Sequence, residues 1–299
     1  MSRPMASDRP LSRRLVRLAA LAAGPARAHR ADLWPGLRIE GERILWRGAP
    51  LPMARPPTSL LPRSVPLAVI GSGPSLRGQD LSALEPGTAI LCNGAASLAP
   101  RLVPAAVAVE DERFVHRRGA LIAELPPGIP LLLSPAALRA LLARGMDVEG
   151  RRIGLIRDLR KPLGGRRRAL SDPSLDAVVI RDRAAALSTD PDCGVVICGT
   201  VALSALQIAL AIRPPRVLLA GIDLGNAAEP RFNETAGDRA PSGLAAGMDR
   251  ILAGFALAWR LAERQRTALA CASPVSALLG LGYPFDDALS PPRPEESGP

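Results

Sequence analysis

Between residues 65 and 272, short apolar runs alternate with stretches of helical periodicity. The apolar runs lie at 65–70, 89–92, 105–109, 130–133, 195–198, 216–220 and 267–272. Helices are expected at 200–212 and 249–265. Short strands that are apolar on both faces and alternate with helices are typical of a parallel sheet with both faces covered. The pattern therefore predicts an α/β fold with a mostly parallel sheet and helices on both faces.

The first residues have a different pattern, that of an amphipathic helix over 11–23. Leucines and arginines each recur at helical spacing, at Leu11, Leu15, Leu18, Arg9, Arg13 and Arg17. Such a helix either lies on an anionic membrane surface through its arginines or packs its leucines on its own domain and leaves the arginines in solvent. The sequence leaves both interpretations open.

Alternation on both sides of Gly41, over 37–46, predicts a β-hairpin, and a proline-rich linker follows it over 50–62. We therefore expect an N-terminal extension over 1–63, made of the helix, the hairpin and the linker. A nucleotide-binding catalytic domain is expected over 64–287. Because prolines and glutamates dominate after Ser290, a disordered tail is expected over 288–299.

Composition excludes several classes of function. Aromatic residues make up only 3% of the 299 residues, which argues against a base-stacking surface and against nucleic acid as a partner. The four cysteines form no metal-ligand spacing, so neither a metal site nor a metal cofactor is expected. No apolar run approaches the ~20 residues that span a bilayer. We therefore expect a cytoplasmic protein, at most peripheral on the inner membrane.

The net charge of +10 comes almost entirely from arginine, because Lys161 is the only lysine. Basic residues are dense over 151–168, where Gly164 and Gly165 indicate a loop. This segment is either a solvated loop or a surface that faces a phosphorylated acceptor or an anionic lipid.

Small and polar residues follow the predicted strands, at the edge where parallel sheets bind ligands. The first strand ends in a glycine turn, whose N–H groups suit a phosphate: Gly71, Ser72, Gly73, Pro74 and Ser75. The amide of Asn93, beside Gly94, suits the edge of a base or a ribose. Gly199 and Thr200 open a helix, which also favours a phosphate. Each of these segments is alternatively an ordinary turn or helix cap.

Acidic and polar groups follow two more strands. Glu110, Asp111 and Glu112 are adjacent, and they supply a general base, hold Mg²⁺ or form a solvated turn. Gly221 and Asp223 close another strand and are candidate nucleotide contacts. Soon after them, Arg231 and Asn233 are candidate contacts for the acceptor or for an anion.

The order of these segments is more specific than any one of them. Gly-x-Gly-Pro-Ser-Leu at 71–76, Cys92-Asn93, the strand ending in Gly221-Ile222-Asp223, and Ser-Pro-Val-Ser at 273–276 follow one another. Over roughly 64–285 this order resembles the bacterial CMP-sialic-acid sialyltransferases of glycosyltransferase family 42. It is also similar to the wider group of proteins that share the Gly-Pro-Ser-Leu turn.

The resemblance implies a Rossmann-like sheet and a metal-independent transfer of an acidic sugar, of the sialic-acid or Kdo type, from a CMP donor. The acceptor would be a surface polysaccharide or a lipopolysaccharide core, free or lipid-linked. The family's CMP contacts match Gly71, Ser72, Gly73, Ser75 and Asn93, and Gly199-Thr200 would lie near the donor phosphate. No histidine occurs in 224–250, where the family has its catalytic histidine, so Glu110 or Asp111 is the expected proton acceptor.

Two alternatives remain. The glycine turn and the acidic strand ends are also similar to archaeal-type 6-hydroxymethylpterin diphosphokinase, which would use Mg-ATP and therefore Mg²⁺. The third interpretation is a nucleotide-binding protein without catalytic activity.

Overall fold

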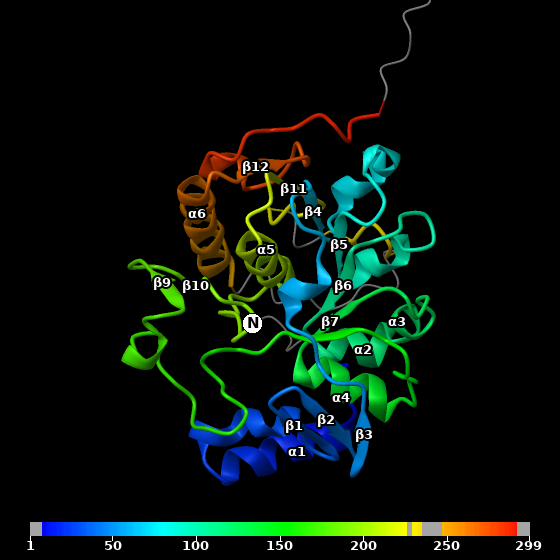
Figure 1. Cartoon of the computed structure of the whole chain (residues 1–299), viewed down its shortest axis with the longest axis vertical. Coiled ribbons are helices and arrows are strands. Elements are labelled where there is room, and N and C mark those ends of the chain that lie inside the picture. Colours follow the sequence, from blue (N-terminus) through cyan, green and yellow to red (C-terminus); the bar gives the residue numbers. More distant parts are fainter. Residues whose placement is uncertain (1–7, 226–228, 235–246, 292–299) are drawn as a thin grey trace, which may run out of the picture.

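A computed structural model describes residues 8–225, 229–234 and 247–291. Its centre is a sheet of seven parallel strands in the order β12-β11-β4-β5-β6-β7-β8 (Figure 1). The strands are β4 (Leu67–Ile70), β5 (Ala89–Cys92), β6 (Ala106–Val109), β7 (Leu131–Leu133), β8 (Ile153–Leu155), β11 (Arg216–Ala220) and β12 (Ala268–Cys271). The chain runs outward from β4 to β8 and then returns to β11 on the other side of β4.

Side chains alternate between two cores, one on each face of the sheet. In β4, Leu67 and Val69 belong to the first core, while Ala68 and Ile70 belong to the second. Helices α5 (Val201–Ala211) and α6 (Met248–Gln265) cover the first face. Helices α2 (Glu112–Arg118), α3 (Ala120–Ala123) and α4 (Pro135–Ala143) cover the second (Figure 1). The predicted α/β class, with a Rossmann-like sheet covered on both faces, is confirmed.

The N-terminal extension begins with helix α1 (Leu11–Ala22) and the 3₁₀ segment η1 (Pro25–Asp32). The hairpin follows as β1 (Leu37–Glu40) and β2 (Arg43–Trp46) in antiparallel register. Both predictions are confirmed. The expected linker begins instead with a third strand, β3 (Ala49–Leu51), which pairs with β2. Pro50 is compatible with it because β3 is an edge strand and leaves one side without a hydrogen-bonding partner.

The rest of that linker joins the extension to the main sheet. The Arg55 amide donates to the Ile153 carbonyl of β8 at 2.8 Å. Thr58, in the 3₁₀ segment η2 (Pro57–Leu60), donates from its amide and its hydroxyl to Asp192 at 2.9 and 2.6 Å. The remaining 3₁₀ segments are η3 (Pro74–Gly78), η4 (Leu81–Ala83), η5 (Asn93–Leu98), η6 (Pro173–Leu175) and η8 (Leu279–Leu281).

Two local predictions are wrong, and one pair of strands was not predicted. Residues 195–198 form no strand, because the Gln207 side chain hydrogen-bonds both the amide and the carbonyl of Val196, and only Val195 makes a bridge, to Asp158. The segment 151–168 is not all loop, since it contains β8. A small antiparallel pair, β9 (Val179–Arg181) and β10 (Ala186–Ser188), was not predicted.

The expected tail begins later than composition suggests. Leu289 is buried, and its carbonyl accepts a hydrogen bond from the Asp80 amide at 2.9 Å, so the packed chain continues past residue 288. The remainder of that tail, 292–299, lies outside the described residues. No helix in the described ranges combines the length and the apolar character needed to cross a membrane.

Candidate functional site

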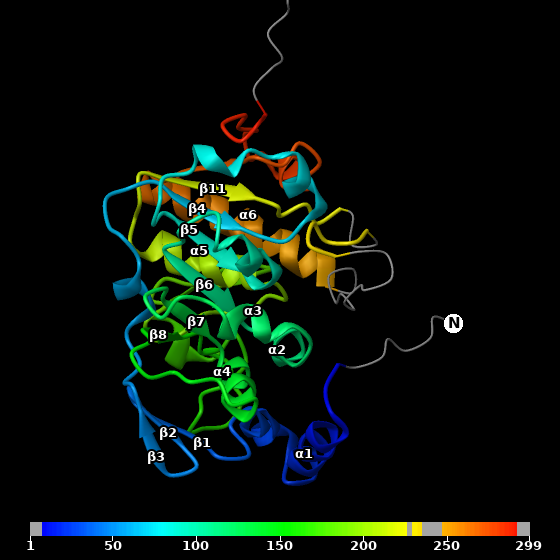
Figure 2. The same ribbon diagram turned by 90° about the vertical axis from the view of Figure 1, so that its right-hand side faces the viewer.

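A cavity of about 360 Å³ opens at the carboxyl edge of the sheet, beyond β6, β7 and β8. Glu110 follows β6, Ser134 follows β7, and Asp158 lies shortly after β8. The N-terminal extension closes the opposite side: in Figure 2, α1 lies at the edge toward which the strand arrows point. The remaining polar and glycine lining comes from Arg9, Arg17, His29, Asp32, Asp111, Glu112, Arg113, Lys161 and Gly199.

Glu110 is the carboxyl in this cavity whose pKa is raised. Its Oε1 atom is buried and has no hydrogen-bond partner in the structure. Burial raises the pKa of the carboxyl to about 7, and the charges of Asp158 and Asp111 act in the same direction. The nearby Ser204 hydroxyl and Lys161 lower that pKa and only partly offset the burial. A carboxyl that titrates near neutrality beside a cavity is suited to accept a proton during a reaction.

Asp111 has a structural partner. One of its oxygens accepts the Arg113 amide at 2.9 Å and caps helix α2, and the other accepts from the Arg113 side chain at 2.7 Å. The carboxylate therefore fixes the start of α2 and the direction of Arg113. Its role as a proton acceptor stays a prediction, and these contacts favour Glu110 for that role.

Glu112 is 1% exposed and lies among four arginines. Arg9 and Arg13 donate to it at 2.5 and 2.9 Å, Arg17 at 2.9 Å, and Arg139 of α4 completes the set. Burial alone would raise the pKa of Glu112, but the arginines outweigh it and hold the pKa at about 2. The carboxylate is therefore an anchor for α1 rather than a catalytic group.

This ion cluster determines which face of α1 is buried. The arginines turn inward to Glu112, whereas Leu11, Leu15 and Leu18 are 71%, 57% and 62% exposed. The expectation that the leucines pack on the domain is therefore wrong. The buried carboxylate binds Arg9, Arg13 and Arg17, so these side chains already have a partner, and a membrane contact made by them stays a prediction.

A smaller pocket of about 50 Å³ lies next to the cavity and shares Asp111 and Arg113 with it. Asn93 and Asn233 line it, and the Oδ1 atom of each is buried without a hydrogen-bond partner in the structure. The Asn233 amide nitrogen lies 3.4 Å from the Gly94 carbonyl. The cationic lining consists of Arg113, Arg117, Arg118 and Arg231. The lining also contains Asp8, Asp111 and Glu234, which pair with Arg117, Arg113 and Arg231. The amide oxygens suit a base edge, whereas an anion would compete with these acids for the guanidinium groups.

The predicted contacts of the glycine turn need correction. The Gly71 and Gly73 amides donate to the carbonyls of Ala220 and Gly221, at 2.8 and 2.7 Å, and the Ser75 amide donates to Asp223. These N–H groups are occupied by the protein and do not face a ligand. The glycines are needed because a Cβ at Gly71 would collide with the Gly221 carbonyl. The turn, which also contains Ser72 and Pro74, therefore joins the end of β4 to the end of β11.

Asp223 is also structural. It is buried and accepts hydrogen bonds from the Ser75 amide, the Ser75 hydroxyl and the Ser273 hydroxyl, at 2.9, 2.5 and 2.6 Å. Asp223 thus holds three segments together: the Gly-Pro-Ser turn, the Gly-Ile-Asp strand end and the Ser-Pro-Val-Ser segment. Neither Gly221 nor Asp223 is among the residues that line these two hollows.

Gly199 and Thr200 occupy the predicted position at the start of α5. The Thr200 hydroxyl accepts from the Ala202 amide at 3.4 Å and caps the helix. Gly199 lines the large cavity, and the Arg250 guanidinium lies beside it, donating to the Cys198 carbonyl at 3.1 Å. This helix start therefore contributes to the cavity wall.

Sequence reasoning missed several cavity residues. Asp158 and Lys161 form an ion pair at 3.3 Å, and Ser134 donates to the Glu110 carbonyl at 2.6 Å. Both Asp158 and Ser134 lie just beyond a strand, so recognising β8 would have identified the first by the rule that identified Glu110. The described residues contain no group of three His, Cys, Asp or Glu side chains placed to hold a metal ion.

Comparisons of this chain with protein-family models, with curated proteins and with solved structures find no match.

Proposed function

We propose that the chain is a glycosyltransferase that uses a CMP-activated acidic sugar, with Glu110 as the general base. The observation that carries this proposal is the Glu110 carboxyl, which has a buried, unpartnered Oε1 atom and a pKa of about 7 at the wall of a cavity. The resemblance of the ordered strand-end segments to family 42 transferases supplies the class of reaction.

The two adjoining hollows suit the two halves of such a donor. The smaller pocket, of about 50 Å³, would contact only a polar edge of the cytosine or its ribose, through Asn93 and Asn233. A phosphate or a sugar carboxylate would bind Arg113 or Arg231 in competition with their partners Asp111 and Glu234. The larger cavity would take the sugar and the acceptor hydroxyl. Glu110 would accept the hydroxyl proton as its oxygen bonds to the anomeric carbon, and CMP would leave with the electrons of the broken C–O bond.

A thermal-shift screen tests the nucleotide. CMP, CDP, UDP, ADP and ATP would each be added with and without Mg²⁺. We expect CMP to raise the Tm without Mg²⁺, because a ligand at 100-fold its Kd stabilises the folded state by about 2.7 kcal/mol. Asn93→Ala should remove this shift. Ser82→Ala is the control, because Ser82 is exposed in η4 and lies outside the lining of both hollows.

Turnover tests the base. Release of CMP from CMP-sialic acid and CMP-Kdo would be followed by NMR with candidate glycan and lipid-linked acceptors. Glu110→Gln should lower turnover by about 10²–10⁴-fold, whereas Glu124→Gln, on the exposed surface, should not. Stabilisation by Mg-ATP alone would instead favour the diphosphokinase alternative, and CMP binding without turnover would favour a non-catalytic nucleotide-binding protein.

A further inference from the structure

The outward face of α1 is an apolar surface without a partner in the described part of the chain. Leu11, Leu15, Leu18 and Leu21 are all more than half exposed, at 71%, 57%, 62% and 52%. The face cannot simply turn inward, because the arginines on the opposite side are bound to buried Glu112. The exposure is thus imposed by the ion cluster.

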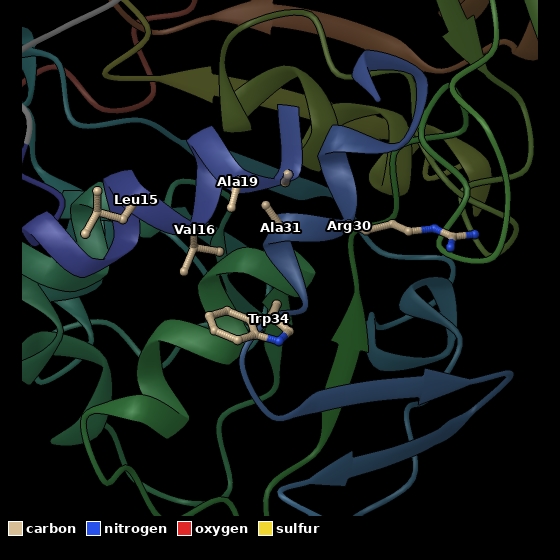
Figure 3. Close-up of a pocket in the computed structure, with 7 residues that line it drawn as sticks. Leu15, Val16, Ala19, Arg30, Ala31 and Trp34 are labelled. Carbon is tan, nitrogen blue, oxygen red and sulfur yellow. The ribbon is translucent and has the colours of Figure 1, made fainter. Parts of the chain in front are cut away.

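An apolar hollow of about 470 Å³ continues this face between α1 and η1. In Figure 3, Leu15, Val16 and Ala19 border it from α1, and Ala31 and Trp34 border it from η1 and the turn that follows. Trp34 is 59% exposed. An exposed tryptophan beside a row of leucines is typical of protein segments that lie at a membrane–water interface.

The basic segment lies beside this apolar surface. The Arg167 amide donates to the Ala26 carbonyl and the Arg30 side chain donates to the Gly164 carbonyl, both at 2.7 Å. His29 Nε2 lies 2.9 Å from the Pro162 carbonyl. In Figure 3, Arg30 points away from the hollow toward this loop. The exposed arginines on the two segments are Arg27, Arg30, Arg166 and Arg167.

We propose that the α1 leucine row, Trp34 and the adjoining arginines of η1 and loop 162–168 form a docking face for an anionic lipid surface. The leucines and Trp34 enter the interface, and the arginines bind lipid phosphates. A bilayer fits both halves of this surface, because it presents an apolar layer bordered by negative charge.

The docking face adjoins the candidate site. The large cavity is lined in part by Arg17 of α1, His29 of η1 and Leu163 of loop 162–168. These are the same three segments that carry the docking face. Docking would therefore hold that cavity near the headgroups, where a lipid-linked acceptor presents its glycan. This assignment of the acceptor rests on the proposed transferase function, whereas the lipid binding itself does not.

Co-sedimentation of the full chain with vesicles tests the docking. We expect binding to vesicles of phosphatidylcholine and phosphatidylglycerol, little binding to phosphatidylcholine alone, and weaker binding at high salt. The double variant Leu15→Gln, Leu18→Gln should weaken binding at least about tenfold, since it removes buried apolar area. The double variant Val103→Gln, Val275→Gln is the matched control, because those side chains are equally exposed but lie elsewhere.

A second set of variants tests the arginines of the docking face. Arg166→Glu with Arg167→Glu should weaken binding to anionic vesicles by about fivefold or more per arginine, whereas Arg101→Glu, on another part of the exposed surface, should not. Circular dichroism would establish that each variant is folded. Wild-type protein that stays in the supernatant with anionic vesicles would overturn the proposal. So would leucine variants that bind like the wild type, or a self-association that depends on Leu15 and Leu18 in the absence of lipid binding. If the wild-type protein bound vesicles but did not bind CMP, the result would count against the transferase function alone.

Discussion

At the scale of single residues, three consecutive acids have three different roles. Glu110 lines a cavity and has a buried oxygen without a partner, Asp111 caps α2, and Glu112 neutralises a cluster of arginines. The difference arises because the chain leaves β6 and enters α2 within these residues, so that consecutive side chains point in different directions. Their order in the sequence carries no information about which partners each one meets.

Glu110→Gln should make the folded protein more stable at alkaline pH. The folded-state pKa of about 7 lies above the ordinary 4.5, so the protonated form is preferred and the folded state is destabilised progressively as pH rises from 4.5 through 7. Removing the charge should raise the free energy of unfolding above pH 7 by on the order of 1–3 kcal/mol.

Urea unfolding of wild type and Glu110→Gln at pH 5 and pH 8 measures this effect. The difference should be small at pH 5 and large at pH 8. An equal difference at both values would mean that the carboxyl is not desolvated, and the basis for its role as a base would be lost.

At the scale of elements, the cluster around Glu112 attaches α1 to α2 and α4. Glu112→Gln should lower the free energy of unfolding by about 3–5 kcal/mol, because it leaves the buried guanidinium groups of Arg13 and Arg139 without their counter-charge. In the wild type, the contribution of the Glu112 carboxylate to the free energy of unfolding is present above pH 4.5. It is lost as pH falls toward 2, because the folded-state pKa of Glu112 is about 2.

Chemical denaturation at pH 7 gives the loss in Glu112→Gln, with the exposed Glu124→Gln as control. A change smaller than about 1 kcal/mol, as exposed ion pairs give, would contradict the anchoring role. At pH 3, the difference in the free energy of unfolding between Glu112→Gln and the wild type should be smaller than at pH 7.

The glycine turn gives a second test at this scale. Gly71→Ala places a methyl group against the Gly221 carbonyl, so β4 and β11 must move apart. We expect a loss of stability of about 1–3 kcal/mol from overpacking. Gly78→Ala is the control, because a Cβ there meets nothing within 4 Å.

The expected readout separates packing from ligand binding. Gly71→Ala should lower the Tm while the folded protein keeps its affinity for CMP, measured by calorimetry below the transition. Wild-type stability with abolished CMP binding would restore the glycine turn as a direct nucleotide contact.

At the scale of the whole molecule, the N-terminal extension is not a separate unit. Leu37, Ile44 and Ala54 belong to the same core as β4 to β8, and Thr58 is bound to Asp192. We therefore expect the extension and the sheet to unfold together, as one cooperative transition.

Tryptophan fluorescence provides the measurement. In Trp259→Phe, the remaining tryptophans, Trp34 and Trp46, both report on the extension, while far-UV circular dichroism reports on the whole fold. The two urea transitions should coincide. Two separated transitions would mean that residues 1–63 fold as an independent domain.

The sequence by itself determined the parallel sheet, the two helices α5 and α6 that cover its first face, the first helix and the hairpin, whereas α2, α3 and α4 on the second face were not located. The elements that it determined depend on local periodicity, which each segment carries in its own residues. It also placed Glu110 and Asn93 at the correct edge, because the carboxyl ends of parallel strands meet on one side of a sheet. Gly199 lines the cavity although the strand expected before it does not form. The strand β8 was missed because charged residues surround its three-residue run.

Only the tertiary structure decided which polar groups are available. The glycine turn has the composition of a phosphate loop, but β11 and Asp223 take its amides. Helix α1 has two candidate faces, and a single buried carboxylate 99 residues from Arg13 selects the one that turns inward. Hydrogen bonds and ion pairs between distant segments have no local signature in the sequence, because each partner has the same composition whether or not the other lies beside it.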